Sequence, residues 1–389
     1  MKGGKLISEG GFGCVFNPSI DCNGSSSSEK FVSKIQRYDN SAKNEIEIGN
    51  ILSKISVYKS HFAPVISYCN IDIGKIKDKD KNKCMLFKKK KTKQYVLMKM
   101  DYIEGMEFLQ YMIKNANSVQ IIKNIINSFN TLLRSISVLI NSKILHYDLK
   151  GSNILYSTRK KIPLIIDFGL SINMNKIDNT ILKNIFYTYA PQYYVWPLEV
   201  HYLGLLFNKN NSPDEEELKS LVNIFVKNNK GINKNFSSKF LKRYEKECLE
   251  QLKIYNEIEY NKRIKYLISF WETWDNYSLS IIYLRFLKYL ALEGFYENAF
   301  IKFMGKLLLQ NIHPNPSKRL SIIDTTHTFN GFLYKEKINV EATFEELTDE
   351  FIKNKKNINK NLKNHNNIDL RDTKTMKIEK RKRIKSLVI

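Results

Sequence analysis

Cysteine is scarce in this sequence, with five residues in a chain of 389. None forms a Cys-x-x-Cys pair, and no set of cysteines and histidines has the spacing of a zinc site. A scattered, odd set in so long a chain is typical of reduced thiols in a cytosolic protein rather than of a disulfide framework. We therefore expect free thiols at Cys14, Cys22, Cys69, Cys84 and Cys248.

Long apolar runs are also lacking. No window approaches the roughly 18 consecutive apolar residues that a membrane helix requires, and the apolar stretch 281–292 is broken by Arg285 and Lys288. The opening Met-Lys-Gly-Gly-Lys has no apolar run of the kind found in a secretory signal. We expect a protein that is neither secreted nor membrane-spanning.

Acidic residues are outnumbered, at 39 against 63 Lys plus Arg, for a formal net charge of +24. Lys-heavy, Ile- and Asn-rich usage also follows from A/T-biased codons, so the charge alone says little about partners. The basic runs 88–91 and 380–383 could contact nucleic acid or another anionic surface. Neither run is interleaved with stacking aromatics, which favours solvated charge instead. The sequence does not indicate an oligomeric state.

Hydrophobic residues make up 43% of the chain, enough for one large or two modest cores. The first hundred residues resemble strands separated by turns, with apolar runs at 31–35, 64–68 and 95–100 and a helical rhythm over 43–55. From about residue 108 the apolar period becomes that of a helix. It is clearest over 122–140, which predicts a strongly amphipathic helix.

These patterns divide the chain into a strand-rich region, 1–100, a helical region, 101–335, and a basic C-terminal extension, 336–389. Within the first region, the stretches near 22–30 and 75–93 are expected to be inserts that form surface loops.

Four separated motifs carry the chemistry, and they occur in a fixed order. Residues 8–15 read Ser-Glu-Gly-Gly-Phe-Gly-Cys-Val, a glycine-rich turn between two strands that can fold over a triphosphate. Lys34 follows on an apolar run, where its charge needs a partner. Residues 146–155 read His-Tyr-Asp-Leu-Lys-Gly-Ser-Asn-Ile-Leu, and residues 164–169 read Leu-Ile-Ile-Asp-Phe-Gly.

Taken together, these motifs resemble the signature of eukaryotic-type protein kinases. Two later segments agree with the resemblance: Trp274–Ser280 is similar to the family's buried helix, whose Asp275 would bond the catalytic loop backbone, and 315–319 is similar to its late Asp-Pro-x-x-Arg turn. The resemblance implies an α+β, bilobal fold, with a small antiparallel sheet plus one helix and a larger, mainly helical lobe. An insertion at 200–274 would extend the helical lobe.

The resemblance also implies a role for each matching residue. Lys34 would contact the α- and β-phosphates and pair with a helix carboxylate, for which Glu47 is preferred narrowly over Glu45 because Ile51 then follows one turn later. Asp148 would orient the substrate hydroxyl and Lys150 would steady the γ-phosphate, while Asn153 and Asp167 would hold Mg²⁺. The glycine-rich loop would cover ATP, through Ile7, Ser8, Gly10, Gly11, Phe12, Gly13 and Val15.

Residues 100–105 resemble the hinge between the lobes, where the backbone of Asp101 and Ile103 would meet adenine. The sequence also departs from the family pattern. Ser8 stands in place of the first loop glycine, and Tyr147 replaces the Arg that normally receives an activation-loop phosphate. The carboxylate that pairs with Arg319 is expected to be Glu199.

The Asp-Leu-Lys-x-x-Asn form of the loop resembles Ser/Thr kinases, so we expect an ATP- and Mg²⁺-dependent enzyme that phosphorylates Ser/Thr hydroxyls of proteins. The alternatives are a catalytically silent scaffold with the kinase fold and a kinase of a small-molecule hydroxyl. The compositional bias and the segment 196–199 further resemble the divergent kinases of large DNA viruses. The expected location is cytoplasmic, in the host cytoplasm or the virion if the protein is viral.

Overall fold

The computed structural model describes residues 4–9, 13–76, 82–88, 94–114, 119–209, 212–233, 236–292 and 299–335. Gly10, Gly11, Phe12, most of the basic run at 88–91 and the extension 336–389 lie outside these ranges. Within them, no helix is long and apolar enough to cross a membrane. The described residues form two units: those of Met1–Glu107 with Asn153–Ile172, and those of Phe108–Ser152 with the described residues between Asn173 and Lys335.

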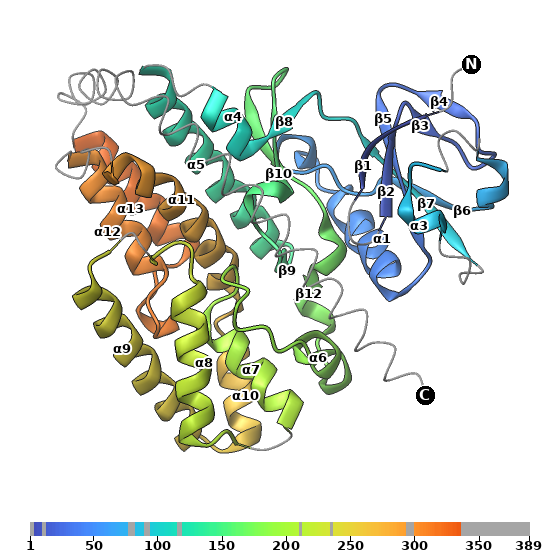
Figure 1. Ribbon diagram of the computed structural model, residues 1–389. Helices are drawn as coiled ribbons and strands as arrows, with labels where there is room; N and C mark the ends of the chain where they lie inside the picture. The colour runs from blue at the N-terminus through green and yellow to red at the C-terminus, as the bar shows by residue number, and fades with distance from the viewer. Residues whose placement is uncertain are drawn as a thin grey trace. The chain divides into compact units, whose positions relative to one another are not determined.

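The first unit contains a five-stranded antiparallel sheet in the order β1-β2-β5-β7-β6 (Figure 1). β6 begins at Ser67, later than the start of the apolar run at 64–68; just before it, the Ala63 N–H donates to the Ile165 carbonyl oxygen and the Ile66 N–H donates to the Lys99 carbonyl oxygen of β7. The strands are β1 (Lys5–Glu9), β2 (Gly13–Asn17), β5 (Phe31–Arg37), β6 (Ser67–Ile71) and β7 (Tyr95–Asp101).

Alternate residues of these strands face opposite sides of the sheet. On one side, Val96 and Met98 of β7 pack against helix α1 (Asn40–Leu52), which contributes Ala42 and Ile46. The helix begins earlier than the expected 43–55 because the Asp39 carboxylate accepts the Ala42 N–H at 3.1 Å and caps it. Lys34 lies on β5 opposite Val15 and Met98 in the strand register.

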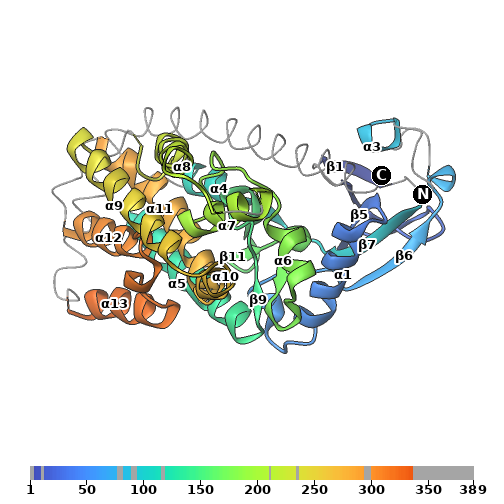
Figure 2. The same cartoon turned by 90° about the horizontal axis from the view of Figure 1, so that it is seen from below.

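The second insert, near 75–93, lies on the other side of the sheet and adds to the apolar core, whereas none of the described side chains of the first insert, near 22–30, is buried. Strand β3 (Ser19–Ile20) comes just before the first insert and pairs with β4 (Ser26–Ser28) inside it, and the second insert contains helix α3 (Met85–Lys88). Figure 2 shows α1 and α3 on opposite sides of the sheet. Ile76 and Cys84 of the second insert are buried with Phe16 and Ile35.

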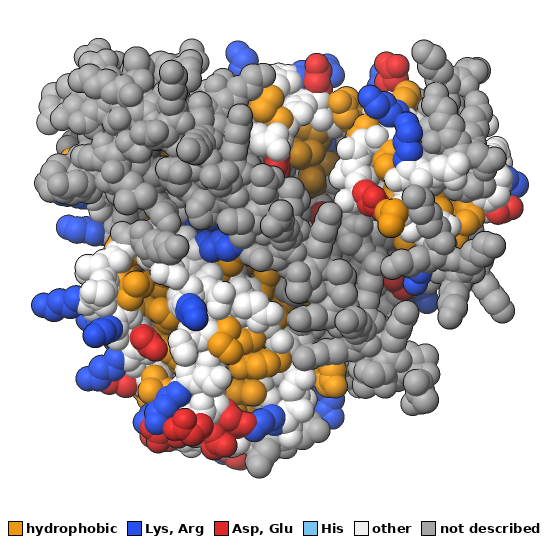
Figure 3. Space-filling model, in the orientation of Figure 1, with side chains coloured by type: hydrophobic (Ala, Val, Ile, Leu, Met, Phe, Trp, Pro, Cys, Tyr) orange, Lys and Arg blue, Asp and Glu red, His pale blue; other side chains and the backbone are white. Residues whose placement is uncertain are grey.

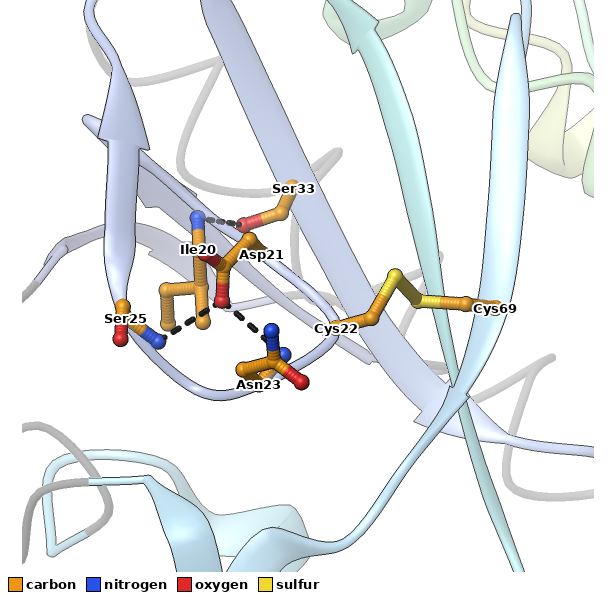
Figure 4. Close-up of a disulfide and its surroundings, with 7 residues drawn as sticks. All are labelled: Ile20, Asp21, Cys22, Asn23, Ser25, Ser33 and Cys69. Carbon is orange, nitrogen blue, oxygen red and sulfur yellow. Dashed lines mark hydrogen bonds between the residues drawn. A yellow bond between two sulfur atoms is a disulfide. The ribbon is translucent and has the colours of Figure 1, made fainter.

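Each insert is joined to the sheet by a disulfide, so the expectation of reduced thiols is wrong for four of the five cysteines. Cys14 of β2 bonds Cys84, and Cys22 bonds Cys69 of β6 (Figure 4). Spacing along the chain gave no sign of these pairs because the partners are 70 and 47 residues apart. Cys248, in the second unit, is a free, buried thiol.

The first unit also holds a small antiparallel sheet in the order β11-β10-β8, made of β8 (Gly105–Glu107), β10 (Ile154–Ser157) and β11 (Ile162–Ile165). Gly105 permits the close approach of β8, since a Cβ there would lie 1.9 Å from the Tyr156 carbonyl oxygen. A short 3-10 turn, η4 (Phe168–Leu170), follows β11.

The second unit is helical. The 23-residue helix α5 (Val119–Asn141) confirms the amphipathic helix expected from the sequence, and it buries Ile125, Phe129, Leu132, Leu133 and Ile136. Each such side chain contributes about 1.5–3 kcal/mol by leaving water. The other helices are α4 (Phe108–Lys114), α6 (Asn179–Phe186), α7 (Leu198–Lys209), α8 (Glu215–Asn228), α9 (Ser238–Glu257), α10 (Tyr260–Ile268), α11 (Trp274–Leu292), α12 (Ala299–Asn311) and α13 (Ile322–Lys335).

The predicted insertion 200–274 is helical and includes most of α7 and all of α8, α9 and α10. Three glutamates occupy the first turn of α8, where the helix dipole favours negative charge, and Asp214 and Glu217 form a capping box. Figure 3 shows acidic side chains gathered at the lower end of its view. An antiparallel sheet with one main helix, followed by a mainly helical part, confirms the predicted α+β class.

Candidate active site

In the strand-rich unit, the Lys34 ammonium lies between two carboxylates. Its Nζ is 2.6 and 2.8 Å from the two carboxylate oxygens of Glu45 on α1, and 3.2 Å from Asp167 Oδ1. The lysine is 8% exposed and Glu45 is 3% exposed. A buried lysine of this kind is stable only with such partners, as the sequence analysis required.

Burial by itself would lower the pKa of Lys34, because an ammonium loses hydration inside the protein. The negative charges of Asp167 and Glu45 outweigh this effect and raise the pKa above its ordinary value. Lys34 is therefore a permanent cation at neutral pH, suited to contact phosphate oxygens.

The partner of Lys34 on α1 is Glu45, so the narrow preference for Glu47 is wrong. That preference rested on placing Ile51, rather than Gly49, one turn after the glutamate. In the structure, Gly49 is where the helix approaches the neighbouring backbone: a Cβ there would lie 2.4 Å from the Val65 carbonyl oxygen. The glycine thus allows α1 to pack closely, which brings Glu45 against Lys34.

Asp167 follows strand β11 with a left-handed backbone, at φ 64°. The next residues are fixed to α1, since the Ser41 hydroxyl donates to the Gly169 carbonyl oxygen at 3.2 Å and the Asn44 side chain donates to that of Ser171 at 2.8 Å. Phe168 is buried and meets the Phe62 ring edge to face at 5.8 Å. Helix α1 and the Asp-Phe-Gly turn therefore form one packed element.

Asn153 lies beside this turn. The Ile166 N–H donates to the Asn153 carbonyl oxygen at 3.0 Å, directly beyond the paired residues Ile154 and Ile165 of the β10–β11 ladder. Asn153 and Asp167 therefore leave the same end of one hairpin. A carboxylate and an amide oxygen at such an end are hard ligands of the kind that Mg²⁺ prefers, so the donor set fits this ion.

Another group with ligand spacing among the described residues is Glu9, Cys14 and Cys84. The two sulfur atoms are joined in a disulfide, which removes the thiolates that a metal would require.

The strands on either side of the glycine-rich loop pair as expected. Ser8 lies opposite Val15, after a register shift that follows Leu6, while Ile7 is half exposed. Gly13 is required by close packing, since a Cβ there would lie 2.5 Å from the Ile35 carbonyl oxygen. These four predicted residues, Ile7, Ser8, Gly13 and Val15, thus lie on one hairpin, whereas the three residues between its strands lie outside the described ranges.

The hinge predicted at residues 100–105 connects β7 to β8. Asp101 ends β7 opposite Phe31, and its carboxylate lies 3.5 Å from the ammonium of Lys59. The Tyr102 N–H donates to the Lys30 carbonyl oxygen at 2.9 Å. Adenine binding by the backbone of Asp101 and Ile103 stays a prediction.

In the helical unit, the predicted catalytic loop (residues 146–155) is held by Asp275 of α11. The buried Asp275 carboxylate accepts the backbone N–H groups of His146 and Tyr147 at 2.7 and 3.1 Å, as the sequence analysis expected. Burial raises the pKa of Asp275, and the charge of His146 and these N–H bonds partly oppose the rise. The Lys150 ammonium lies 2.9 and 2.8 Å from the two oxygens of the buried Asp148 carboxylate.

Tyr147, which replaces the family's Arg, lies in an aromatic cluster. Its ring stacks on Trp196 with centroids 4.6 Å apart, and the Trp196 indole N–H donates to the Tyr147 carbonyl oxygen at 2.6 Å. The Tyr147 backbone is left-handed, at φ 65°. Because burial raises the pKa of the Tyr147 phenol well above its ordinary value, this side chain stays neutral.

The expected partner of Arg319 is also present. Its guanidinium bonds both oxygens of Glu199 at 2.6 and 2.9 Å, and both side chains are almost fully buried. Residues 190–192, Ala-Pro-Gln, also resemble the end of the family's activation segment, but Gln192 carries no carboxylate and is exposed. The choice of Glu199 is confirmed.

One close contact in this unit had no signal in the sequence: the Tyr193 hydroxyl donates to Asp148 Oδ1. The local run Gln-Tyr-Tyr-Val gives no period or motif that separates Tyr193 from Tyr194. Only the folded chain distinguishes the two, since Tyr194 bonds Arg285 instead.

The predicted catalytic side chains thus form an ionic group in each unit: a lysine bridging two carboxylates on the sheet, and an Asp-Lys pair on a loop fixed to a buried helix. A strand-rich unit with one main helix and a helical unit with these ionic groups have the composition of an α+β phosphotransferase of the kinase class. The protein kinase domain model matches residues 1–195, half of the chain, and the chain belongs to that family. No curated protein matches it.

Proposed function

We propose that the protein transfers the γ-phosphoryl group of ATP to Ser or Thr hydroxyls of protein substrates, with Mg²⁺ as the metal. The observation that carries this proposal is the Lys34 ammonium, fixed between Glu45 and Asp167. A cation held at 8% exposure by two carboxylates is suited to phosphate oxygens, and one of its partners is suited to a metal that binds the same phosphates.

In this proposal, Lys34 binds the α- and β-phosphates and Glu45 keeps its ammonium in place. Asp167 and Asn153 would hold Mg²⁺, which neutralises phosphate charge. Asp148 accepts the proton of the substrate hydroxyl, and Lys150 steadies the γ-phosphoryl oxygens. The proposal requires both groups of side chains to act on one nucleotide.

The test is phosphoryl transfer from γ-labelled ATP to a peptide array, comparing the wild type with Asp148→Ala and Asp167→Ala. We expect each substitution to reduce labelling about 10²–10⁴-fold, as for loss of a positioned base or charge-stabilising group. Equal labelling in all three would refute the assignment. Labelling confined to tyrosine or to small molecules would refute the Ser/Thr protein class.

A catalytically silent scaffold is the alternative. It predicts that ATP·Mg²⁺ raises the melting temperature while no turnover occurs.

The proposal also includes a resemblance to the divergent kinases of large DNA viruses and a cytoplasmic location. The viral resemblance rests on the Lys/Ile/Asn composition and on the residues Trp-Pro-Leu-Glu at 196–199. The cytoplasmic location rested on the expectation of reduced thiols, and four of the five cysteines are joined in disulfides.

A further inference from the structure

The Asp148 carboxylate has two side-chain donors within the helical unit. Lys150 donates to both of its oxygens, whereas the Tyr193 hydroxyl donates to Oδ1 alone. Asp148 is 1% exposed and Tyr193 is 4% exposed, so water competes little for these bonds. The two donors are therefore not equivalent: the lysine bonds both carboxylate oxygens, whereas the tyrosine bonds one of them.

This difference matters because the terminal torsion of an aspartate is broad and roughly two-fold. A lysine that bridges both oxygens fixes the distance of the carboxylate but tolerates its twist. A second donor on one oxygen removes that freedom. The bond from Tyr193 therefore favours one plane of the Asp148 carboxylate, and with it one direction from which the carboxylate can accept a proton.

The backbone that carries Tyr193 is itself anchored on both sides. The Tyr193 N–H donates to the Ala190 carbonyl oxygen at 2.8 Å. Beyond it, the Ser278 hydroxyl donates to the Val195 carbonyl oxygen at 2.8 Å, and Arg285 donates to the Tyr194 hydroxyl at 2.7 Å. Both of these donors lie on α11, the helix whose Asp275 holds the catalytic loop.

The catalytic loop and the segment 193–196 are also joined directly. Trp196 stacks on Tyr147, donates to its carbonyl oxygen and meets the Tyr193 ring edge to face at 5.0 Å. Tyr193 and Asp148 are therefore both fixed to α11, and bonded to each other, through buried contacts. A segment anchored in this way is suited to permanent alignment rather than to movement in and out of the site.

We propose that Tyr193 is a positioning residue for the phosphoryl-transfer reaction: its hydroxyl fixes the orientation of the Asp148 carboxylate toward the substrate hydroxyl. The inference rests on the proposed function, since it assigns Asp148 the role of base. Tyr193 acts through Asp148 and contacts neither nucleotide nor metal in this mechanism.

The experiment compares Tyr193→Phe with the matched control Tyr283→Phe. Both remove one hydroxyl from a buried tyrosine, but the Tyr283 hydroxyl bonds Ser128 in the helical core. For Tyr193→Phe we expect kcat to fall about 10- to 100-fold, as for a reacting group displaced from its best geometry. The KM for ATP stays unchanged, and Tyr283→Phe leaves both constants unchanged.

The pH dependence of kcat separates positioning from a merely structural effect. A donor to a carboxylate favours its charged form, so its removal moves the acidic limb of the profile of Tyr193→Phe to higher pH. The control keeps the wild-type profile. A kcat and profile equal to those of the control would overturn the proposal. A kcat above that of the wild type would also overturn it, since the hydroxyl would then obstruct the base.

Stability measurements test the contact without relying on turnover. Tyr193→Phe and Asp148→Asn are combined, and urea midpoints are measured for the singles and the double. We expect the double to lose less than the sum of the singles, because the two residues share one hydrogen bond. Additive losses would overturn the inference. If the two substitutions prove coupled but the wild-type protein transfers no phosphoryl group, the proposed function is refuted, and with it the role of Tyr193 in catalysis.

Discussion

The partner of Lys34 can be decided by one pair of isosteric substitutions, Glu45→Gln and Glu47→Gln, on the same helix. Glu45 is 3% exposed and bonds the lysine through both oxygens, while Glu47 is partly exposed. Glutamine keeps the shape of the side chain but removes the charge. The two variants therefore differ in whether a buried ammonium loses one of its counter-charges.

The magnitude follows from these contacts. A hydrogen bond to a charged group contributes about 1.5–3 kcal/mol, more than a neutral one. Asp167 remains 3.2 Å from the ammonium in Glu45→Gln, so we place the loss of unfolding free energy at the lower part of this range, about 2 kcal/mol. Glu47→Gln should change it by no more than about 0.5 kcal/mol, as is usual at partly exposed positions.

The assay is urea unfolding of both variants and the wild type at several pH values. The raised pKa of Lys34 means that its pairing stabilises the fold fully below its ordinary value of 10.5 and is lost as the pH rises through the raised value. The difference between Glu45→Gln and wild type should therefore be constant from pH 6 to 9. An equal or larger loss in Glu47→Gln, or a difference that titrates within this window, would refute the reasoning.

Three further predictions concern other parts of the chain. Reduction of the Cys14–Cys84 disulfide opens a loop of 70 residues, which should lower the unfolding free energy by about 4 kcal/mol in the chain-entropy description; a urea midpoint unchanged by dithiothreitol would contradict it. Glu199→Gln leaves the buried guanidinium of Arg319 without its counter-charge and should lower the free energy of unfolding by about 3–5 kcal/mol in the same assay. Adding Arg319→Met should recover part of this loss, and full stability of the single variant would show that the pair is dispensable. Burial lowers the pKa of His201 to about 3, so below pH 6 the imidazole is protonated in the unfolded chain but not in the folded one, and the free energy of unfolding should fall by about 1.4 kcal/mol per pH unit. His201→Gln should lose this part of the slope, and an unchanged slope would exclude the histidine as its source.

The order of the motifs was readable from the sequence because each is a short run whose chemistry is local. A lysine on an apolar strand must be paired, and an aspartate at a strand end is suited to a metal, wherever the rest of the chain lies. The period of the helix at 119–141 and the strands near Lys34 could be predicted in this way. The pairing of Glu199 with Arg319 and the bonds of Asp275 to the loop at 146–155 join residues far apart in the chain, and they were predicted from the resemblance to the protein kinase family.

Which of several candidate residues forms a given contact was decided only by the tertiary structure. Glu45 and Glu47 differ by two positions on one helix, and the close approach of Gly49 to Val65 determines which of them reaches Lys34. The disulfides join cysteines 70 and 47 residues apart, and Tyr193 meets a carboxylate 45 residues earlier in the chain. The sequence by itself determined which groups need partners, since side-chain charge and the hydrophobicity of the neighbouring residues can be read from the chain. Which groups meet depends on how distant backbones pack, and that is a property of the folded chain alone.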